Sequence, residues 1–464
     1  MKKVIILAAG EGTRMKSKHS KVLHKIVNKT LLDYVVEASK EAGVEETIAI
    51  VGKNEAEVRA YFGDAIKYRV QNIGPEFPYG TGYAIMQAVD LIEDEDTILV
   101  LSGDVPLISN KTIKNILDYH ESNELDATVL TALFEDPFGY GRIIKENGKF
   151  LKIVEQKDGT EEELLEKEIN SGIYSFNGKK LKDSLKQLNT DNAQGELYLT
   201  DVFSILKEGE NNIGTFMIED HDEIRGINSK VQLSEAEEIM RMRINKTYMD
   251  AGVVLENPRT ITIEKGVEIG RDTVIEAGTK ILGKTKIGED CFIGFNSRIM
   301  DSTIGNNVKI QSSYVEKSIV EDYTDIGPFA RLRPNAHLKQ HVHIGNFVEV
   351  KNSTVGDGTK AGHLAYIGDS DLGKDINVGC GVIFVNYDGK FKHRSVIEDG
   401  AFIGSNSNIV APVHVEKEGY IAAGSTITRN IGEGELSIER AVQRNIPGYV
   451  EKKKRRDLKR EQEK

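Results

Sequence analysis

The stretch that decides the fold of the C-terminal half is Ile263–Ile299, IEKGVEIGRDTVIEAGTKILGKTKIGEDCFIGFNSRI. Seven isoleucines in it stand six residues apart: Ile263, Ile269, Ile275, Ile281, Ile287, Ile293 and Ile299. An α-helix repeats every ~3.6 residues and a strand every second residue, so neither accounts for this period. A hexapeptide β-helix does, because each hexad forms a short strand and a turn, and three hexads close a triangular coil. The aliphatic residue then points inward and stacks on the coils above and below.

The same step returns further along the chain, in two runs: Ile326, Leu332, Leu338, Ile344, Val350 and Ile397, Ile403, Ile409, Val415, Ile421, Ile427. Glycine often follows the aliphatic residue, as in Ile403-Gly404. The frame slips by one residue at three places: Ile299 to Ile304, Val350 to Val355, and Ile367 to Leu372. We expect local corrections of the coil at these places.

Two segments depart from the repeat. Asn386–Arg394, NYDGKFKHR, predicts a loop that leaves the coil. Long excursions from a solenoid are often functional, although a tolerated surface insertion would give the same pattern. The final stretch, EKKKRRDLKREQEK, is charged throughout and predicts a solvated, mostly disordered tail.

The N-terminal half alternates strand-like and helix-like segments. Strands are expected at residues 3–10, 46–52 and 97–104, and helices at residues 30–43 and 81–92. This alternation implies right-handed βαβ units and a mostly parallel sheet. Ligands bind outside the carboxyl ends of the strands in such sheets, where Gly10 and Asp104 fall.

One helix is predicted between the two patterns, at residues 229–250, with Ser234 and Glu237 resembling a capping box. The predicted domains are an α/β domain at residues 1–228, a helical arm at 229–250, a β-helix domain at 251–440 and a charged tail at 441–464.

Composition limits the classes of function. The 464 residues suffice for two or three domains, and the net charge of −12 disfavours nucleic acid as the main partner, because an acidic surface repels phosphates. Two cysteines suit a reducing cytosol. The chain enters a strand at once, so no signal peptide is expected, and no apolar run approaches the roughly 20 residues needed to span a bilayer. We therefore expect a cytoplasmic protein without a membrane span.

The turn after the first strand reads LAAGEGTRM, Leu7–Met15. Its two glycines allow backbone N–H groups to approach a phosphate closely. A dinucleotide-binding turn would have glycine at Met15, and a Walker A loop would have GK[ST], so neither fits. Arg14 offers a cationic fork suited to a phosphoryl group in flight, and Lys21 could add a second cation. A plain glycine turn with surface cations is the alternative for this stretch alone.

Further short motifs follow in order along the N-terminal half. SGDVPL places Asp104 at the end of a strand, where a carboxylate can hold Mg²⁺ beside a phosphate. YGTG, residues 79–82, is a turn of small residues that opens a helix and suits close contact with a base or sugar. The remaining motifs are GYGRI with Gly141, IVEQKD with Glu155, EINSGIY with Asn170 and RGINS with Asn228. Each alone would more often be structural than functional.

Together, these motifs and the hexapeptide repeat resemble the bacterial bifunctional N-acetylglucosamine-1-phosphate uridylyltransferases / glucosamine-1-phosphate N-acetyltransferases. The resemblance covers essentially the whole chain apart from the charged tail. It implies a Rossmann-like nucleotidyltransferase domain followed by a left-handed parallel β-helix of hexapeptide repeats. It also implies two activities, acetyl transfer from acetyl-CoA to glucosamine-1-phosphate and uridylyl transfer from UTP to the product. The resulting UDP-N-acetylglucosamine is a precursor for peptidoglycan and, where present, lipopolysaccharide.

The resemblance assigns roles in the first domain. The residues implied at the UTP and UDP-N-acetylglucosamine site are Leu7, Ala8, Ala9, Gly10, Lys21, Gln71, Gly80, Thr81, Gly141, Glu155, Asn170 and Asn228. Asp104 and Asn228 would bind Mg²⁺. No protein nucleophile is needed, because the sugar phosphate attacks the α-phosphorus of UTP and pyrophosphate leaves. Arg14 and Lys21 would neutralise the growing charge.

The second site is expected on the β-helix. Coils of about 18 residues stack roughly 4.8 Å apart, so residues 18 apart are axial neighbours. Arg333 and Lys351 meet this condition and suit a phosphate. By resemblance they hold the phosphate of glucosamine-1-phosphate, Tyr366 and Asn377 contact its sugar, and His363 is the general base. His363 follows Lys351 by two hexads, so this pair must meet across a corner of the prism or through a neighbouring subunit.

Acetyl-CoA would contact Cys380, Asn386, Tyr387, Ser405, Ala423 and Arg440 by the same resemblance. Asn386 would orient His363 or the substrate, and Ser405 would stabilise charge on the thioester. Cys380 departs from the family pattern, where a small residue such as alanine is expected. The family also implies a homotrimer with CoA sites between prisms.

Two other readings remain at this stage. One is a nucleotidyltransferase whose β-helix is only a regulatory or assembly scaffold, as in ADP-glucose pyrophosphorylases. The other is a non-catalytic β-helix binding module, which would need rows of surface threonine that the hexads lack. Whether acetyl-CoA is consumed with glucosamine-1-phosphate distinguishes the bifunctional enzyme from these two alternatives.

Overall fold

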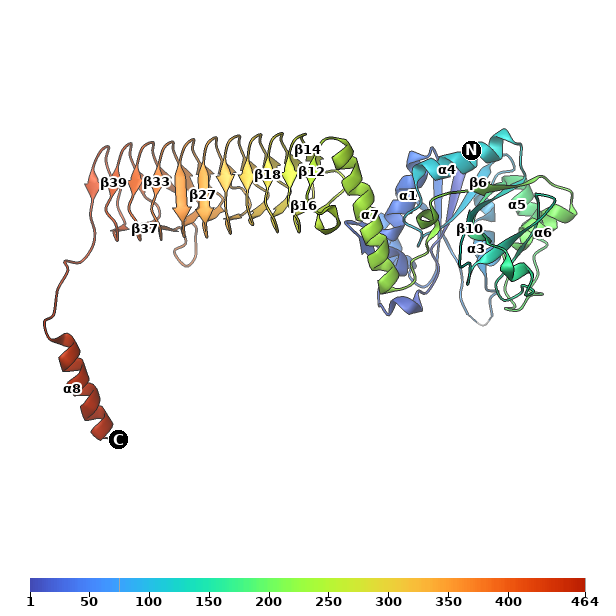
Figure 1. Ribbon diagram of the computed structural model, residues 1–464, viewed down its shortest axis with the longest axis horizontal. Coiled ribbons are helices and arrows are strands. Elements are labelled where there is room, and N and C mark those ends of the chain that lie inside the picture. The colour runs from blue at the N-terminus through green and yellow to red at the C-terminus, as the bar shows by residue number, and fades with distance from the viewer. Residues whose placement is uncertain (75, 464) are drawn as a thin grey trace. The chain divides into compact units, whose positions relative to one another are not determined.

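The computed structural model describes residues 1–74 and 76–463. The chain divides into two compact units, Met1–Arg241 and Met242–Lys464. Figure 1 shows an α/β unit and a long stack of short strands. This agrees with the fold class predicted from the sequence, a nucleotidyltransferase-type sheet and a left-handed β-helix.

The first unit is built on a nine-stranded mixed sheet in the order β11-β7-β10-β6-β1-β4-β5, with β8 and β9 joined at β10. Strands β4, β1 and β6 are parallel neighbours, whereas β10 is antiparallel to β6 and β7. Its strands are β1 Lys2–Leu7, β4 Glu46–Val51, β5 Lys67–Val70, β6 Thr97–Ser102, β7 Ala127–Leu133, β8 Gly141–Glu146, β9 Lys149–Val154, β10 Glu168–Asn177 and β11 Ile213–Met217, and β2 Lys25–Ile26 pairs separately with β3 Lys29–Thr30.

Helices cover both faces of this sheet. They are α1 Leu31–Glu41, α2 Glu55–Phe62, α3 Thr81–Met86, α4 Asn110–Ser122, α5 Gly178–Leu185 and α6 Asp201–Glu208. Alternate residues of β1 face opposite sides, so Val4 and Ile6 pack in the core with α1 and α4, and Ile5 packs in the core with α3, α5 and α6.

Two local features show how the sequence sets these helices. Thr30 begins α1 as a capping box: its hydroxyl accepts from the backbone N–H of Asp33, whose carboxylate accepts from the N–H of Thr30. The single helix expected at residues 81–92 is wrong in length, because α3 ends at Met86 and a separate 3-10 turn, Val89–Leu91, follows.

His120 on α4 makes the stability of the first unit depend on pH. Burial lowers the pKa of His120 to about 4, and its Nδ1 lies 2.8 Å from Thr128 Oγ1. Because the folded pKa lies below the unfolded value, the unfolded state binds more protons between pH 6.5 and 4, and stability falls as pH falls through that window. We expect about 2 kcal/mol less unfolding free energy at pH 5 than at pH 7 from this group. Urea unfolding of wild type and His120→Gln should show a smaller pH dependence in the variant; an equal dependence would contradict this origin.

Helix α7, Lys230–Asp250, occupies the predicted arm. The predicted capping box is wrong, because Ser234 lies one turn inside the helix. Ser229 serves as the cap instead: its Oγ accepts from the N–H of Gln232 at 3.2 Å. In the first unit, Leu233, Ala236 and Met240 pack with buried residues such as Leu31 and Leu107.

The second unit is a β-helix of three parallel sheets (Figure 1). The 11-stranded sheet contains β12 Val254–Leu255, β15 Val274–Ile275, β18 Phe292–Ile293, β21 Lys309–Ile310, β24 Asp325–Ile326, β27 His343–Asn346, β30 Lys360–His363, β33 Asn377–Val378, β36 Phe402–Ile403, β39 Tyr420–Ile421 and β41 Leu436–Ser437. The 10-stranded sheet contains β13 Thr262–Ile263, β16 Lys280–Leu282, β19 Arg298–Met300, β22 Tyr314–Glu316, β25 Arg331–Leu332, β28 Glu349–Lys351, β31 Tyr366–Gly368, β34 Ile383–Val385, β37 Asn408–Val410 and β40 Thr426–Ile427. The 9-stranded sheet contains β14 Glu268–Ile269, β17 Lys286–Ile287, β20 Thr303–Ile304, β23 Ile319–Val320, β26 His337–Leu338, β29 Thr354–Val355, β32 Ser370–Leu372, β35 Ser395–Ile397 and β38 His414–Val415.

The repeat residues form the interior of this prism, in one continuous apolar cluster. Ile263 pairs in register with Ile281, and Ile281 with Ile299, so the coil is 18 residues there. The expected corrections occur: Ile287 pairs with Ile304, and Val350 with Ile367, each 17 residues apart. The shortened turns hold residues with positive φ, Asp301, Asn352 and Asp369.

The C-terminal half of α7 belongs to this second unit. Asn245, which is fully buried, donates from Nδ2 to the carbonyls of Pro258 (2.7 Å) and Ile261 (2.9 Å). The Tyr248 hydroxyl donates to the carbonyl of Val267 at 2.8 Å. Ile244 and Met249 pack on the apolar core of the prism. The helix therefore closes the first coil.

A fragment that begins at Met242 should thus be more stable than one that begins at Ala251. The shorter fragment exposes the end of the core and loses the bonds of Asn245 and Tyr248, which we expect to cost roughly 3 kcal/mol of unfolding free energy. Urea unfolding of the two fragments measures this difference. Equal stabilities would mean that the helix adds nothing to the prism.

The departures from the repeat are ordered. Within the insertion, His393 N–H donates to the carbonyl of Asn386 (2.8 Å), and Tyr387 forms an antiparallel bridge with Lys392, so the loop is a hairpin. The expectation of a mostly disordered tail is wrong, because helix α8 spans Tyr449–Gln462. Lysine, arginine and glutamate are good helix formers, and α8 has no buried residue. No helix in the described residues is long and apolar enough to cross a membrane.

Candidate active sites

A cavity of about 330 Å³ lies at the carboxyl ends of β1 and β6. Nine residues predicted for the first site line it: Leu7, Ala8, Ala9, Gly10, Lys21, Gln71, Gly80, Thr81 and Asp104. Val22, Tyr79, Ala84, Ser102 and Glu196 complete the lining. The turn that follows β1 and the strand-end carboxylate thus share one hollow, as expected for a parallel sheet.

The segment around Gly80 forms one wall of this cavity. Gly82 N–H donates to the carbonyl of Leu197, and Leu197 N–H donates to the carbonyl of Tyr79, both at 2.8 Å. The Thr81 hydroxyl accepts from Leu199 N–H at 3.1 Å. Gly80 has φ of 120°, and a Cβ there would lie 2.4 Å from the carbonyl oxygen of Leu197. Only glycine fits this close approach of two backbones.

Gly80→Ala should therefore displace this wall and impair the uridylyl transfer that the resemblance implies. We expect kcat/KM for UTP to fall roughly 10²-fold, the effect of misplacing a bound substrate by about 1 Å. Steady-state kinetics of both activities would show acetyl transfer unchanged. Gly43→Ala is the matched control, because Gly43 also has positive φ but nothing lies within 4 Å of its Cβ position. Equal kinetics in the two variants would refute the packing argument.

The two predicted metal ligands lie together at the edge of the cavity. Ile227 N–H donates to the carbonyl of Asp104 at 2.9 Å, which holds the Asn228 segment against the strand end. The Lys21 ammonium contacts the Asp104 carboxylate and donates to Asn228 Oδ1 at 2.9 Å. One positive charge thus lies between the two oxygen donors.

This donor set fits Mg²⁺. The ion takes hard oxygen ligands and is usually held by one or two carboxylates, with waters and substrate phosphates completing its shell. No cluster of three or more His, Cys, Asp or Glu that could hold a metal occurs among the residues that the structure describes.

Gly141, Glu155 and Asn170 come together from β8, the end of β9 and β10. Gly141 pairs with Asn170, and a Cβ on Gly141 would lie 3.4 Å from both Asn170 Cβ and Glu155 Oε2. Burial raises the pKa of Glu155, despite a hydrogen bond of 3.2 Å from the Thr200 hydroxyl. Asn170 Nδ2 donates to the Tyr174 hydroxyl at 3.0 Å. Thr200 was not predicted from the sequence, because a single threonine in a loop carries no pattern.

Arg14 is placed differently from its motif neighbours. It lies on the 3-10 turn Thr13–Met15 with an exposed side chain, outside the cavity lining, whereas Met15 is 1% exposed. The turn thus directs Met15 into the core and Arg14 outward. The motif ends in Arg-Met because the methionine anchors the turn.

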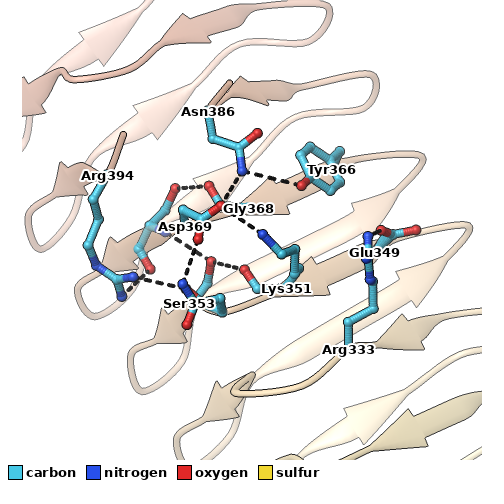
Figure 2. A network of polar contacts seen from close by, with 11 residues as sticks. Arg333, Glu349, Lys351, Ser353, Tyr366, Gly368, Asp369, Asn386 and Arg394 are labelled. Atoms are coloured by element: carbon cyan, nitrogen blue, oxygen red, sulfur yellow. Dashed lines mark hydrogen bonds and ion pairs between the residues drawn. The ribbon is translucent and has the colours of Figure 1, made fainter. Parts of the chain in front are cut away.

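Arg333 and Lys351 are axial neighbours on the 10-stranded sheet, as their spacing predicted, since Leu332 pairs with Val350. Each contacts a carboxylate (Figure 2): Arg333 Nη1 donates to Glu349 Oε1 at 2.8 Å, and Lys351 Nζ to Asp369 Oδ2 at 2.9 Å. Burial raises the pKa of the Asp369 carboxyl, but donors from Asn352, Lys351 and Asn386 outweigh it and lower the net value. Asp369 thus stays ionised and holds the lysine.

Asp369 is the centre of this polar network and was not predicted. It accepts from Asn352 Nδ2 at 2.5 Å and also from Asn386, whose Nδ2 lies 3.4 Å from the Tyr366 hydroxyl (Figure 2). The residue that pairs in register with Lys351 is Gly368, so the coil spacing alone does not single out Asp369. Lys392 of the insertion hairpin also contacts this polar network, at Lys351. The proximity of the two cations lowers the pKa of Lys392.

His363 lies at the end of β30, on the 11-stranded sheet, and so across a corner from Lys351, as expected. Its Nδ1 is 2.9 Å from the side-chain oxygen of Asn346, which pairs with it in register. Asn386 was expected to orient either His363 or the substrate. Its side chain donates to Asp369 and lies near the Tyr366 hydroxyl, so the partner of His363 is Asn346 instead. Asn346 was not predicted from the sequence, although it lies one coil earlier.

Three of the six residues predicted for acetyl-CoA form an axial row. Val378 pairs with Ile403, and Ile403 with Ile421, so Cys380, Ser405 and Ala423 follow one another two residues further on. Ala361 pairs with Val378, which places His363 in the same row opposite Cys380. Arg440 Nη1 donates to the carbonyl of Ala423 at 2.7 Å. The Cys380 thiol is exposed, and so is Tyr387 in the insertion.

Asn377 stands apart from the residues predicted to share its sugar. It lies on the 11-stranded sheet between Lys360 and Phe402, whereas Tyr366 lies on the 10-stranded sheet. Within one chain the predicted residues for glucosamine-1-phosphate are therefore divided between two faces.

The α/β unit has a nucleotide-sized cavity beside the carboxylate of Asp104 and the amide of Asn228. The β-helix has the cations Arg333 and Lys351, with the axial row of His363 on the adjoining sheet. Together these features define a transferase with two sites. Comparisons with known proteins agree. Residues 3–252 match the nucleotidyl transferase family, residues 266–301 match the bacterial transferase hexapeptide (six repeats), and residues 395–429 match the hexapeptide repeat of succinyl-transferase.

Relatives match along nearly the whole chain. The bifunctional protein GlmU of Clostridioides difficile (strain 630) is 49% identical over 98% of this chain and 98% of its own length. That of Alkaliphilus metalliredigens (strain QYMF) is 48% identical over 97% of this chain and 98% of its own length. That of Enterococcus faecalis (strain ATCC 700802 / V583) is 49% identical over 97% of this chain and 97% of its own length. The chain belongs to the GlmU family of bifunctional proteins. It is a bifunctional enzyme that acetylates glucosamine-1-phosphate and uridylylates the product to give UDP-N-acetylglucosamine.

Proposed function

We propose that the cavity at β1 and β6 binds UTP and N-acetylglucosamine-1-phosphate. Leu7–Gly10 and Gln71 contact the nucleotide, Gly80 and Thr81 lie close to the base, and Gly141, Glu155 and Asn170 hold the sugar. The observation that supports this most strongly is the shared lining of the cavity by nine predicted residues. The backbone N–H groups of the turn after β1 suit phosphate oxygens.

Asp104 and Asn228 would hold Mg²⁺, which neutralises phosphate charge when it is bound. The sugar phosphate oxygen attacks the α-phosphorus, the bond to the β-phosphate oxygen breaks, and pyrophosphate leaves. The chain supplies position and charge, with Lys21 at the cavity edge and Arg14 on the adjoining turn. Arg14 must turn inward to reach a bound nucleotide, because its side chain is exposed.

We assign acetyl transfer to the β-helix. Arg333 and Lys351 bind the phosphate of glucosamine-1-phosphate, and Tyr366 and Asn377 contact its sugar. The amine attacks the thioester carbonyl of acetyl-CoA, the C–S bond breaks, and CoA leaves as the thiolate. His363 takes the proton of the amine. Asn386 holds the substrate, Ser405 stabilises the charge on the thioester oxygen, and Cys380, Tyr387, Ala423 and Arg440 contact CoA.

The acetyl-transfer site would be completed between copies of the chain in a homotrimer. The division of Asn377 and Tyr366 between two faces is compatible with this arrangement, since a ligand that touches both must lie at a corner of one prism or between two prisms. The enzyme would act in the cytoplasm, where UTP and acetyl-CoA occur.

One experiment tests the assignment. The purified protein is supplied with glucosamine-1-phosphate, acetyl-CoA, UTP and Mg²⁺, and products are identified by mass spectrometry. We expect UDP-N-acetylglucosamine, CoA and pyrophosphate. Omission of acetyl-CoA should leave glucosamine-1-phosphate largely unused, and omission of UTP should stop the reaction at N-acetylglucosamine-1-phosphate. CoA release without either sugar product would refute the assignment.

A further inference from the structure

We propose that Asn346 is a positioning residue for acetyl transfer, which fixes the tautomer and the orientation of the His363 imidazole. The inference rests on the proposed role of His363 as general base. Asn346 and His363 are paired in register on adjacent coils, and the side-chain oxygen of Asn346 lies 2.9 Å from His363 Nδ1. The backbone is fixed at the same point, because Leu364 N–H donates to the carbonyl of Asn346 at 3.0 Å.

The chemistry of an amide oxygen gives this contact its meaning. An amide oxygen only accepts hydrogen bonds, so the imidazole must carry its proton on Nδ1. The lone pair is then on Nε2, which has no hydrogen-bond partner among the residues that the structure describes. A general base needs such a free lone pair aimed at the proton it takes. Without Asn346 the ring can turn and can place its proton on Nε2, where it blocks the reaction.

Comparison with other histidines of the β-helix shows what is particular about this pair. His337, His343 and His414 each lie within 2.7 Å of a carboxylate one coil earlier, on Glu321, Asp325 and Glu398. A carboxylate stabilises the imidazolium, which cannot accept a proton. The partner of His363 is uncharged, so it can orient the ring without favouring the protonated form.

Few ionisable groups face His363 from the adjoining strands. On β27, His343 pairs with Lys360 rather than with His363. On the coil after β30, the register places the Cys380 thiol opposite His363. Lys351 and Asp369, across the corner, are engaged with each other. A negative charge introduced at position 346 should therefore be the main new electrostatic influence on the His363 imidazole.

Two substitutions of Asn346 test the proposal. Asn346→Leu keeps the size but removes the acceptor, and we expect kcat for acetyl transfer to fall about 10-fold or more, with KM for glucosamine-1-phosphate within about twofold. Asn346→Asp keeps the acceptor and adds a charge. We expect it to retain most of kcat at high pH, while the acid limb of its kcat/KM profile moves to higher pH by about one unit.

Controls separate the possible failures. Asp325→Leu removes the partner of His343 on the same sheet and should leave kcat and the pH profile unchanged; uridylyl transfer reports folding in every variant. If His363→Ala keeps wild-type acetyl transfer, the proposed base is wrong. If His363→Ala is impaired but Asn346→Leu keeps its kcat, or Asn346→Asp keeps the wild-type pH profile, the positioning role is overturned. A large rise in KM in Asn346→Leu would also overturn it, since Asn346 would then bind substrate.

Discussion

Acetyl transfer by His363→Ala should be roughly 10²- to 10⁴-fold slower than by the wild type, the usual contribution of a general base. The amine of glucosamine-1-phosphate must lose a proton as it attacks the thioester, and His363 is the exposed imidazole that shares the axial row of Cys380, Ser405 and Ala423. KM for glucosamine-1-phosphate should change far less, because Arg333 and Lys351, the proposed ligands of its phosphate, lie on another sheet and are unaltered. Steady-state acetyl-transfer kinetics with detection of the released thiol measures both constants.

A matched control is available on the same sheet of the prism. His343→Ala removes a histidine of the 11-stranded sheet that is paired with Asp325 and should leave acetyl transfer unchanged. Uridylyl transfer from N-acetylglucosamine-1-phosphate should be unaffected in both variants. Wild-type acetylation by His363→Ala would return His363 to a structural role.

Uridylyl transfer by Asp104→Ala should fall by at least about 10³-fold, the loss of several kcal/mol of charge stabilisation. Asp104 is buried at the end of β6, accepts a hydrogen bond of 2.7 Å from the Ser102 hydroxyl, and contacts the Lys21 ammonium, which also donates to Asn228. Its removal leaves one oxygen donor for Mg²⁺. The variant's activity should respond to Mg²⁺ only at much higher concentration, as a titration of rate against metal would show.

The isosteric Asp104→Asn separates charge from packing. It keeps the shape of the side chain, so a loss as large as that of the alanine variant would identify the negative charge as the cause. Chelation of Mg²⁺ should abolish uridylyl transfer in the wild type and leave acetyl transfer intact. If both activities fell together in a folded protein, the assignment of two separate sites would fail.

The two catalytic folds differ in how far the sequence predicts them. The β-helix follows from Ile263–Ile299 because one residue in six is buried at fixed spacing, and the coil length then determines axial neighbours such as Arg333 with Lys351. The shortened turns could be predicted from the places where the six-residue spacing falls to five. In the α/β unit, buried strands and glycine turns indicated the architecture, but the break after α3 and the antiparallel β10 depend on packing that no local pattern encodes.

The sequence by itself determined the two folds, the motif residues around the cavity and the stacking of Arg333 on Lys351, since these depend on local patterns and a fixed repeat. Tertiary structure alone decided the partners of these residues. Asn346 and Asp369 are ordinary polar residues of a repeat, and they gain a role only when the next coil brings His363 or Lys351 within hydrogen-bond distance. Lys21 and Asn228 are 207 residues apart in the sequence, and the fold places Lys21 Nζ 2.9 Å from Asn228 Oδ1. Hydrogen bonds and charge interactions act over a few ångströms, so their pairing is fixed by the packing of distant segments, which the order of residues in one segment does not contain.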